Sequence, residues 1–151
     1  MLAAVFRYRT LMGRCDLGYG LDLDEIEDVA QIEREFAPRE KTARRFRREK
    51  VTLGAIVRGD QINDAIDVVE LGPGGLVCRK APFIARGELV EIVIDDGECS
   101  YRFRATGVWM RDDGEDYKVG LAFVGMPVCL HRVQVSRHVA DVVDKIVAAA
   151  A

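Results

Sequence analysis

The central part of the chain, residues 51–125, alternates apolar and polar side chains with a period of two. The stretch 101–109 shows the pattern most clearly, with Tyr101 and Phe103 on one face and Arg102 on the other. Such alternation is typical of β-strands that are buried on one side only. Turn residues separate the short runs, which predicts a mainly β fold, an antiparallel β-barrel of six strands rather than a parallel sheet. The predicted strands lie at residues 51–57, 66–68, 76–81, 88–94, 101–109 and 117–123.

Helical spacings flank this region on both sides. Asp22 followed by Glu25 predicts a reciprocal capping pair at the start of a helix that continues to about residue 36. An earlier helix over 2–12 and a glycine-containing loop over 13–20 complete a helical hairpin, which we expect to pack on the barrel or to form a homodimer. Residues 127–148 return to helical spacing and predict a C-terminal helix. The expected organisation is a helical hairpin at 1–37, a basic arm at 38–50 and a barrel with its C-terminal helix at 51–148.

The charge of the chain is unevenly distributed. The net charge is −3, but residues 39–50 contain seven basic and two acidic side chains, so the rest of the chain carries −8. A basic arm on an acidic body indicates a localised anion site rather than a nucleic-acid surface. No run approaches the ~18 apolar residues that span a bilayer. Arg7 and Arg9 interrupt the N-terminal apolar stretch too early for a signal peptide, so we expect a cytoplasmic protein without membrane contact.

The sequence offers little for catalysis or metal binding. Neither a Gly-x-Ser-x-Gly elbow nor a phosphate-binding loop occurs, and the Asp95–Gly97 and Asp112–Gly114 stretches suit hairpin turns better than paired catalytic carboxylates. His131 and His138 are expected to share a face of the C-terminal helix without a further ligand, which predicts no metal site. We therefore expect neither an enzyme nor a cofactor. The four cysteines are scattered and are expected to be reduced thiols, at positions Cys15, Cys78, Cys99 and Cys129.

Two short stretches point to a ligand. Residues Arg44–Arg48 read RRFRR, and about twenty residues later Val69–Leu76 reads VELGPGGL. Arginines four apart can close around a planar anionic ligand, because guanidinium groups bind phosphates and guanine edges with two parallel hydrogen bonds. A glycine-rich turn allows the ligand to approach the backbone closely. The two stretches together predict one binding site.

The order of arginine motif, β-barrel and C-terminal helix resembles the PilZ family, whose members are bacterial receptors for cyclic di-GMP. The resemblance covers residues 40–147. The family's first motif, RxxxR or RRxxR, fits Arg44–Arg48. Its second motif, (D/N)xSxxG, aligns with Glu70, Gly72 and Gly75, so that only the final glycine is retained.

The resemblance implies roles for these residues. Arg44 and Arg48 would hold the guanine edges and phosphates of cyclic di-GMP, with Arg45 and Arg47 as helpers. Glu70 keeps the acceptor chemistry of the family's Asp or Asn with one more methylene. Glycine in place of serine at position 72 removes one hydrogen bond, worth about 0.5–1.5 kcal/mol net. The expected ligand-binding residues are Arg44, Arg45, Arg48, Glu70, Gly72 and Gly75.

The resemblance implies a cyclic di-GMP-binding regulatory protein that controls motility or surface behaviour. Ligand-induced ordering of the arm would then change the surface offered to an unidentified protein partner. The alternative is a degenerate PilZ domain that binds no nucleotide and acts as a protein–protein adaptor. A third interpretation, a small barrel that binds nucleic acid through the arm, is opposed by the acidic body.

Overall fold

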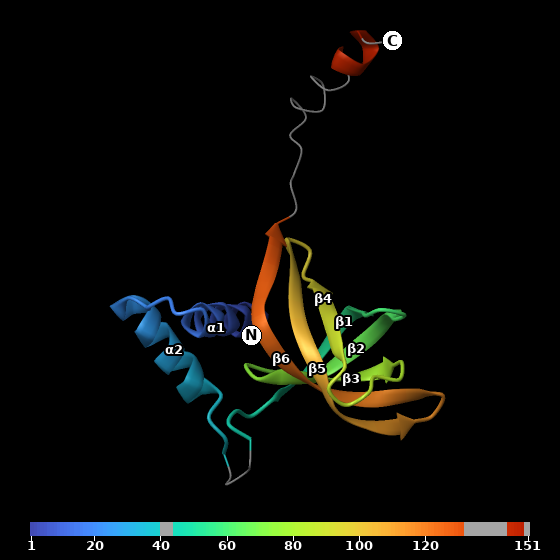
Figure 1. Cartoon of the computed structure of the whole chain (residues 1–151), viewed down its shortest axis with the longest axis horizontal. Coiled ribbons are helices and arrows are strands. Elements are labelled where there is room, and N and C mark those ends of the chain that lie inside the picture. The colour runs from blue at the N-terminus through green and yellow to red at the C-terminus, as the bar shows by residue number, and fades with distance from the viewer. Residues whose placement is uncertain (40–43, 132–144, 150–151) are drawn as a thin grey trace.

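The computed structural model describes residues 1–39, 44–131 and 145–149. Two helices are followed by six strands, which close into an antiparallel barrel in the order β1-β2-β3-β6-β5-β4 (Figure 1). The elements are α1 (Leu2–Asp16), α2 (Leu23–Glu35), β1 (Glu49–Arg58), β2 (Asn63–Gly72), β3 (Gly75–Ala81), β4 (Leu89–Asp95), β5 (Cys99–Asp113) and β6 (Asp116–His131). The predicted six-stranded antiparallel barrel is confirmed.

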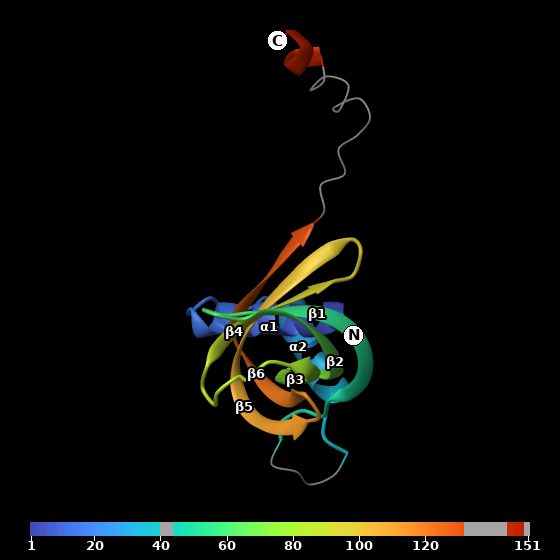
Figure 2. The same cartoon turned by 90° about the vertical axis from the view of Figure 1, so that its right-hand side faces the viewer.

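The period-two pattern fills the barrel. Alternate residues of the strands point inward, and Val57, Val68, Ile92, Phe103 and Leu121 are each at most 1% exposed. The barrel closes because β1 pairs with β2 along most of its length and with β4 near its end. Figure 2, turned by 90°, shows the strands curving around a common interior.

Strand β6 is longer than expected and corrects the prediction of a helix that starts at Pro127. Its last residues pair with β5, His131 opposite Cys99 and Cys129 opposite Tyr101. The strand was not recognised because Val128 and Leu130 are apolar yet about half exposed on the outer face. The alternation of apolar and polar residues that marks a strand is therefore absent here. Residues 145–149 are helical, and the predicted helical positions 132–144 lie outside the described residues.

The N-terminal helical hairpin is confirmed, including its capping box. The side chain of Asp22 accepts a hydrogen bond from the Glu25 backbone N–H at 2.8 Å, and the Glu25 side chain accepts one from the Asp22 N–H at 3.2 Å. Helix α1 is longer than predicted, because Gly13 is part of the helix. A Cβ at Gly13 would lie 2.9 Å from the Cβ of Met126 in β6, so this glycine permits close helix–strand contact rather than a turn.

The hairpin and the barrel share one hydrophobic core, so the expected packing of the hairpin on the barrel is confirmed. Val5, Tyr8, Ile32 and Phe36 are buried together with the inward-facing barrel residues. Phe6 adds edge-to-face ring contacts to two residues of β5, with centroids 5.3 Å from Tyr101 and 6.4 Å from Phe103. Within the parts of the chain that the structure describes, the helices lack the length and apolar character needed to cross a membrane.

Candidate anion-binding site

The two stretches that the sequence singled out lie against each other. Strand β1 begins at Glu49, so the last two residues of the predicted arm already belong to the barrel. The segment before it, residues 44–48, lies over the β2–β3 turn. A Cβ at Gly72 would be 2.7 Å from the carbonyl oxygen of Arg47, and one at Gly75 would be 3.0 Å from Nη2 of Arg48. The arginine motif and the glycine turn therefore form one surface.

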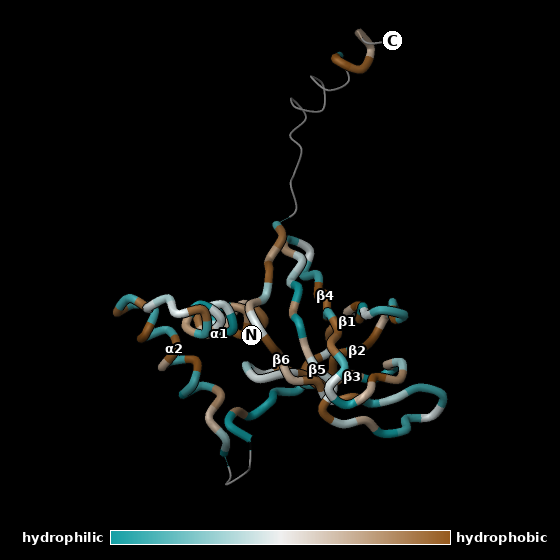
Figure 3. The backbone as a smooth tube through the Cα atoms, viewed as in Figure 1, coloured by the Kyte–Doolittle hydropathy of each residue, from teal (hydrophilic) through white to brown (hydrophobic). Residues whose placement is uncertain are grey.

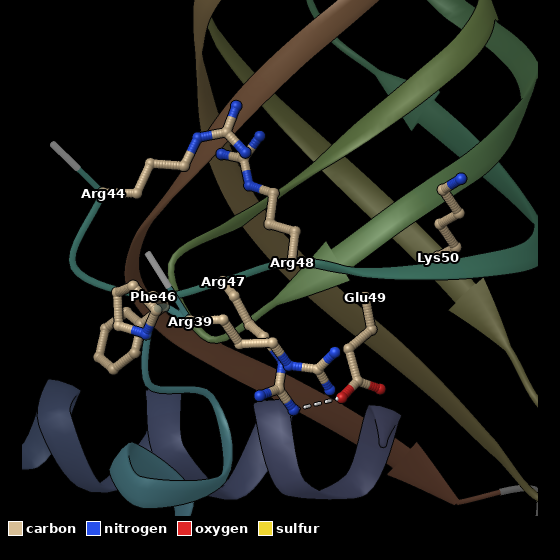
Figure 4. A pocket seen from close by; sticks show the side chains of 8 residues that line it. Arg39, Arg44, Phe46, Arg47, Arg48, Glu49 and Lys50 are labelled. Atoms are coloured by element: carbon tan, nitrogen blue, oxygen red, sulfur yellow. Dashed lines mark hydrogen bonds and ion pairs between the residues drawn. The ribbon is translucent and has the colours of Figure 1, made fainter. Parts of the chain in front are cut away.

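A pocket of about 590 Å³ opens beside this surface (Figure 4). Its lining combines five cationic side chains with a single carboxylate, and hydrophilic residues dominate the segment that enters β1 (Figure 3). The lining residues are Pro38, Arg39, Arg44, Phe46, Arg47, Arg48, Glu49 and Lys50. Such an excess of positive charge in a hollow favours an anionic ligand.

Arg48 combines burial with charge in this pocket. Its side chain is half-buried, and its Nη1 atom is buried without a hydrogen-bond partner among the described residues. Burial lowers the pKa of Arg48, the neighbouring charge of Arg44 lowers it further, and Glu70 opposes both effects. Figure 4 shows the guanidinium groups of Arg44 and Arg48 next to each other. Two adjacent cations repel each other, so an anion bound between them would relieve an unfavourable interaction.

Arg45 and Arg47 each form an ion pair, Arg45 with the helical hairpin and Arg47 with the first residue of β1. Nη2 of Arg45 forms an ion pair at 3.0 Å with Glu33 of α2, and the Arg45 side chain is 72% exposed. Arg47 pairs with Glu49 at 2.8 Å, and its backbone N–H donates to the carbonyl of Phe36 at 2.9 Å. Arg45 also lines a smaller hollow of about 140 Å³ with Arg44 and Arg48. The predicted helpers thus connect the site to α2.

Glu70 and the two glycines lie next to Arg47 and Arg48 but are not among the residues that line the two hollows. Glu70 lies opposite Lys50 in the β1–β2 ladder, and its charge acts on Arg48. At position 72, where the PilZ motif has serine, the Arg47 carbonyl occupies the space that a Cβ would need. A Cβ at Gly75 would overlap the Leu121 carbonyl oxygen. The glycines therefore allow the arginine segment and β6 to approach the turn.

Two sets of residues in the structure could not be recognised from the sequence. Phe46 lies inside the arginine motif and its ring packs edge-on to Tyr8 at 5.3 Å, which anchors the segment to α1. At the other end of the barrel, Cys99, Cys129 and His131 have their ligand atoms within 4.8 Å of one another. The available signal was the spacing of Cys129 and His131, which places both on one face of a strand. The assignment of this stretch to a helix concealed it.

Fold and site together define a six-stranded antiparallel barrel with a helical hairpin and an arginine-lined pocket. No protein-family model matches the chain. Over 75 residues the chain is 33% identical to the co-chaperonin GroES of Caldicellulosiruptor saccharolyticus, and equally to that of Caldicellulosiruptor bescii. Each match covers 48% of this chain and 70% of the relative. By this identity and coverage, the matched half of the chain belongs to the GroES co-chaperonin family.

Proposed function

We propose that the chain is a receptor of the PilZ type, which binds cyclic di-GMP in the arginine-lined pocket and regulates motility or surface behaviour. The observation that carries the proposal is the placement of Arg44 and Arg48 side by side above the Gly72–Gly75 turn. The two motifs are separated by about twenty residues in the sequence and lie against each other in space, which supports a single shared site.

The chemistry and size of the pocket support this ligand. Cyclic di-GMP carries two phosphates and two guanines, and guanidinium groups bind both kinds of acceptor. Arg48 has a buried Nη1 atom whose hydrogen-bonding capacity is unused among the described residues. The pocket volume of about 590 Å³ lies in the range of roughly 300–1,000 Å³ found for small-molecule sites.

The contacts of the arginine segment supply a mechanism. Arg45 holds Glu33, and the Arg47 backbone holds Phe36, so a ligand that moves residues 44–48 also acts on α2. We expect ligand binding to order this segment and to reorient α2 toward a protein partner. Hydrogen exchange with and without cyclic di-GMP would test this coupling. Protection in 44–48 and an altered rate in α2 are expected, whereas unchanged exchange in both would exclude it.

Calorimetric titration of cyclic di-GMP into the full chain tests the ligand itself. We expect saturable binding by the wild type, loss of binding in the Arg44→Ala/Arg48→Ala double variant, and no binding of GMP. Arg34→Ala is the matched control, because it removes an exposed arginine that pairs with Glu27 within α2 and lies outside both hollows. No heat and no thermal shift at about 100 µM ligand would reject a micromolar site. The protein–protein adaptor would then be the better proposal.

A second candidate function rests on the sequence match to GroES. The relatives are named as co-chaperonins, so this chain would act with a chaperonin through its barrel surface. Co-sedimentation of the chain with a purified chaperonin, with and without ATP, tests it. Complex formation that survives the Arg44→Ala/Arg48→Ala substitution would favour this function over nucleotide reception. Absence of a complex, together with cyclic di-GMP binding, would reject it.

A further inference from the structure

Three metal-ligating side chains gather where the start of β5 meets the end of β6. These strand ends lie on the side of the barrel away from the segment that leads from α2 into β1 (Figures 1 and 2). Cys99 is the first residue of β5, and Cys129 and His131 are among the last three residues of β6. Cys99 lies directly opposite His131, and Tyr101 directly opposite Cys129. Since opposite residues in an antiparallel pair point to the same face, all three side chains project together.

The ligand atoms are already near one another. Sγ of Cys99 is 3.0 Å from Nδ1 of His131, and the three ligand atoms lie within 4.8 Å of one another. A tetrahedral zinc ion with Zn–S of about 2.3 Å and Zn–N of about 2.0–2.1 Å places such atoms roughly 3.5–3.8 Å apart. The Cys99–His131 spacing is slightly shorter than this range, and the upper limit of 4.8 Å for the three atoms is slightly longer, so the donors lie close to the geometry that an ion needs.

We propose that Cys99, Cys129 and His131 form a zinc-binding site with one coordination position open to water or another ligand. Zinc is commonly bound by cysteine thiolates and histidine imidazoles, and thiolate donors select it over harder divalent ions such as magnesium and calcium. The site is independent of the arginine-lined pocket and of its ligand. His131 is exposed and Cys129 is half-buried, so an ion can enter from solvent.

The surrounding backbone holds Cys99 in place. Asp96 in the β4–β5 turn accepts hydrogen bonds through Oδ1 from the backbone N–H groups of Glu98, at 3.0 Å, and Cys99, at 2.8 Å. These contacts fix the start of β5 without involving the Cys99 sulfur. Outer contacts of this kind orient the residues that bind a metal.

A disulfide is the competing use of the two cysteines. Cys99 and Cys129 are diagonal neighbours in the β5–β6 ladder, because their direct partners are His131 and Tyr101. Diagonal neighbours are roughly 7–8 Å apart, beyond the usual Cα separation of about 4.4–6.8 Å in disulfides. A metal ion spans this separation more readily than a sulfur–sulfur bond. Bound zinc would tie the β4–β5 turn to the end of β6.

The site is tested by titrating Co²⁺, and then Zn²⁺, into the reduced full chain. We expect one equivalent of Co²⁺ to give thiolate charge-transfer absorption and the strong visible bands of tetrahedral cobalt, and Zn²⁺ to displace it and raise the melting temperature. Removal of supporting residues around metal sites costs 10–100-fold in affinity, so loss of a ligand in Cys129→Ser or His131→Ala should cost at least about 100-fold.

Two controls make the outcome decisive. Cys15→Ser removes an exposed thiol in α1 and should leave the cobalt spectrum unchanged. His131→Ala changes an exposed residue at a strand end, so its circular dichroism should match that of the wild type. The proposal is overturned if the wild type gives no thiolate–cobalt absorption. It is equally overturned if folded His131→Ala binds as tightly as the wild type, or if Cys15→Ser abolishes binding.

Discussion

The arginine segment, residues 44–48, and the Gly72–Gly75 turn beneath it contribute opposite properties to the candidate site. The segment supplies charge and is partly exposed, and it is held by polar contacts to α2 and β1 and by the Phe46 ring against Tyr8 of α1. The turn supplies no side-chain chemistry at its glycines, yet the Arg47 and Leu121 carbonyls lie where their Cβ atoms would be. Substitution of Arg44 or Arg48 should therefore change mainly ligand binding, whereas substitution of Gly72 or Gly75 should change mainly the fold.

The largest effect on stability is expected for Gly75→Ala. Its Cβ would overlap the Leu121 carbonyl oxygen in β6, and this backbone atom cannot move without disturbing the β3–β6 ladder. We expect the free energy of unfolding to fall by about 3 kcal/mol, measured by urea denaturation. Gly74→Ala is the matched control, since its nearest neighbour, Phe46, would be at an ordinary 3.6 Å. Equal losses for the two variants would contradict the packing argument.

Gly72→Ser, which restores the residue of the PilZ motif, should produce the next largest effect. The new Cβ would meet the Arg47 carbonyl oxygen at 2.7 Å, so residues 44–48 must move outward. We expect a loss of about 1–2 kcal/mol in the free energy of unfolding. Calorimetry should show weaker binding of cyclic di-GMP than in the wild type. Tighter binding would mean that the missing hydroxyl, rather than space, limits affinity.

A smaller effect is expected where the segment meets the helices, for Tyr8→Phe. The Tyr8 hydroxyl donates to Glu33 at 3.1 Å, and its loss should cost about 1 kcal/mol at neutral pH. Burial and this hydrogen bond raise the pKa of Tyr8 from 10.0 to about 12. Tyr8 therefore stabilises the fold fully below pH 10, and this contribution is lost as the pH rises toward 12.

Denaturation at a series of alkaline pH values checks the sign of this linkage. Stability should fall less steeply between pH 10 and 12 in Tyr8→Phe than in the wild type. Some slope should remain, because burial also raises the pKa of Tyr101 and of Cys78 to about 12. A steeper fall in the variant would refute the assignment.

The smallest effect is expected for Arg45→Ala. Its ion pair with Glu33 is exposed to solvent, and such pairs contribute less than about 1 kcal/mol. Binding of cyclic di-GMP should change little, because the pair directs Arg45 toward α2. Arg44→Ala should reduce binding strongly, because its guanidinium group lines the pocket beside that of Arg48. If calorimetry shows that Arg45→Ala loses binding and Arg44→Ala does not, the assignment of Arg44 to the ligand and of Arg45 to α2 is wrong.

The sequence was sufficient for those features that depend on local pattern. The alternation in 101–109 and the Asp22–Glu25 pair correspond to a strand and a capping box in the structure. It was insufficient where four arginines share the same chemistry, because the ion pair of Arg45 with Glu33 depends on how α2 packs against the segment.

Contacts that depend on the pairing register of distant strands also could not be predicted from the sequence. Cys99 and His131 are 32 residues apart, and only the pairing of β5 with β6 brings them together. The end of β6 was mistaken for a helix because Val128 and Leu130 are apolar on its exposed face. Likewise, Gly13 was interpreted as part of a loop, whereas in the structure a glycine is needed there because Met126, remote in sequence, packs against the helix.

The rings of Phe6, Tyr101 and Phe103 have a consequence for how the chain melts. Because the helical hairpin contributes to the same buried core as the barrel, neither part keeps its interior covered without the other. Heating should therefore give one cooperative transition in calorimetry rather than two. A fragment that begins at residue 38 would expose the aromatic side chains of β5 that Phe6 covers, and it should self-associate. The hairpin therefore acts as a cover for the core of the barrel.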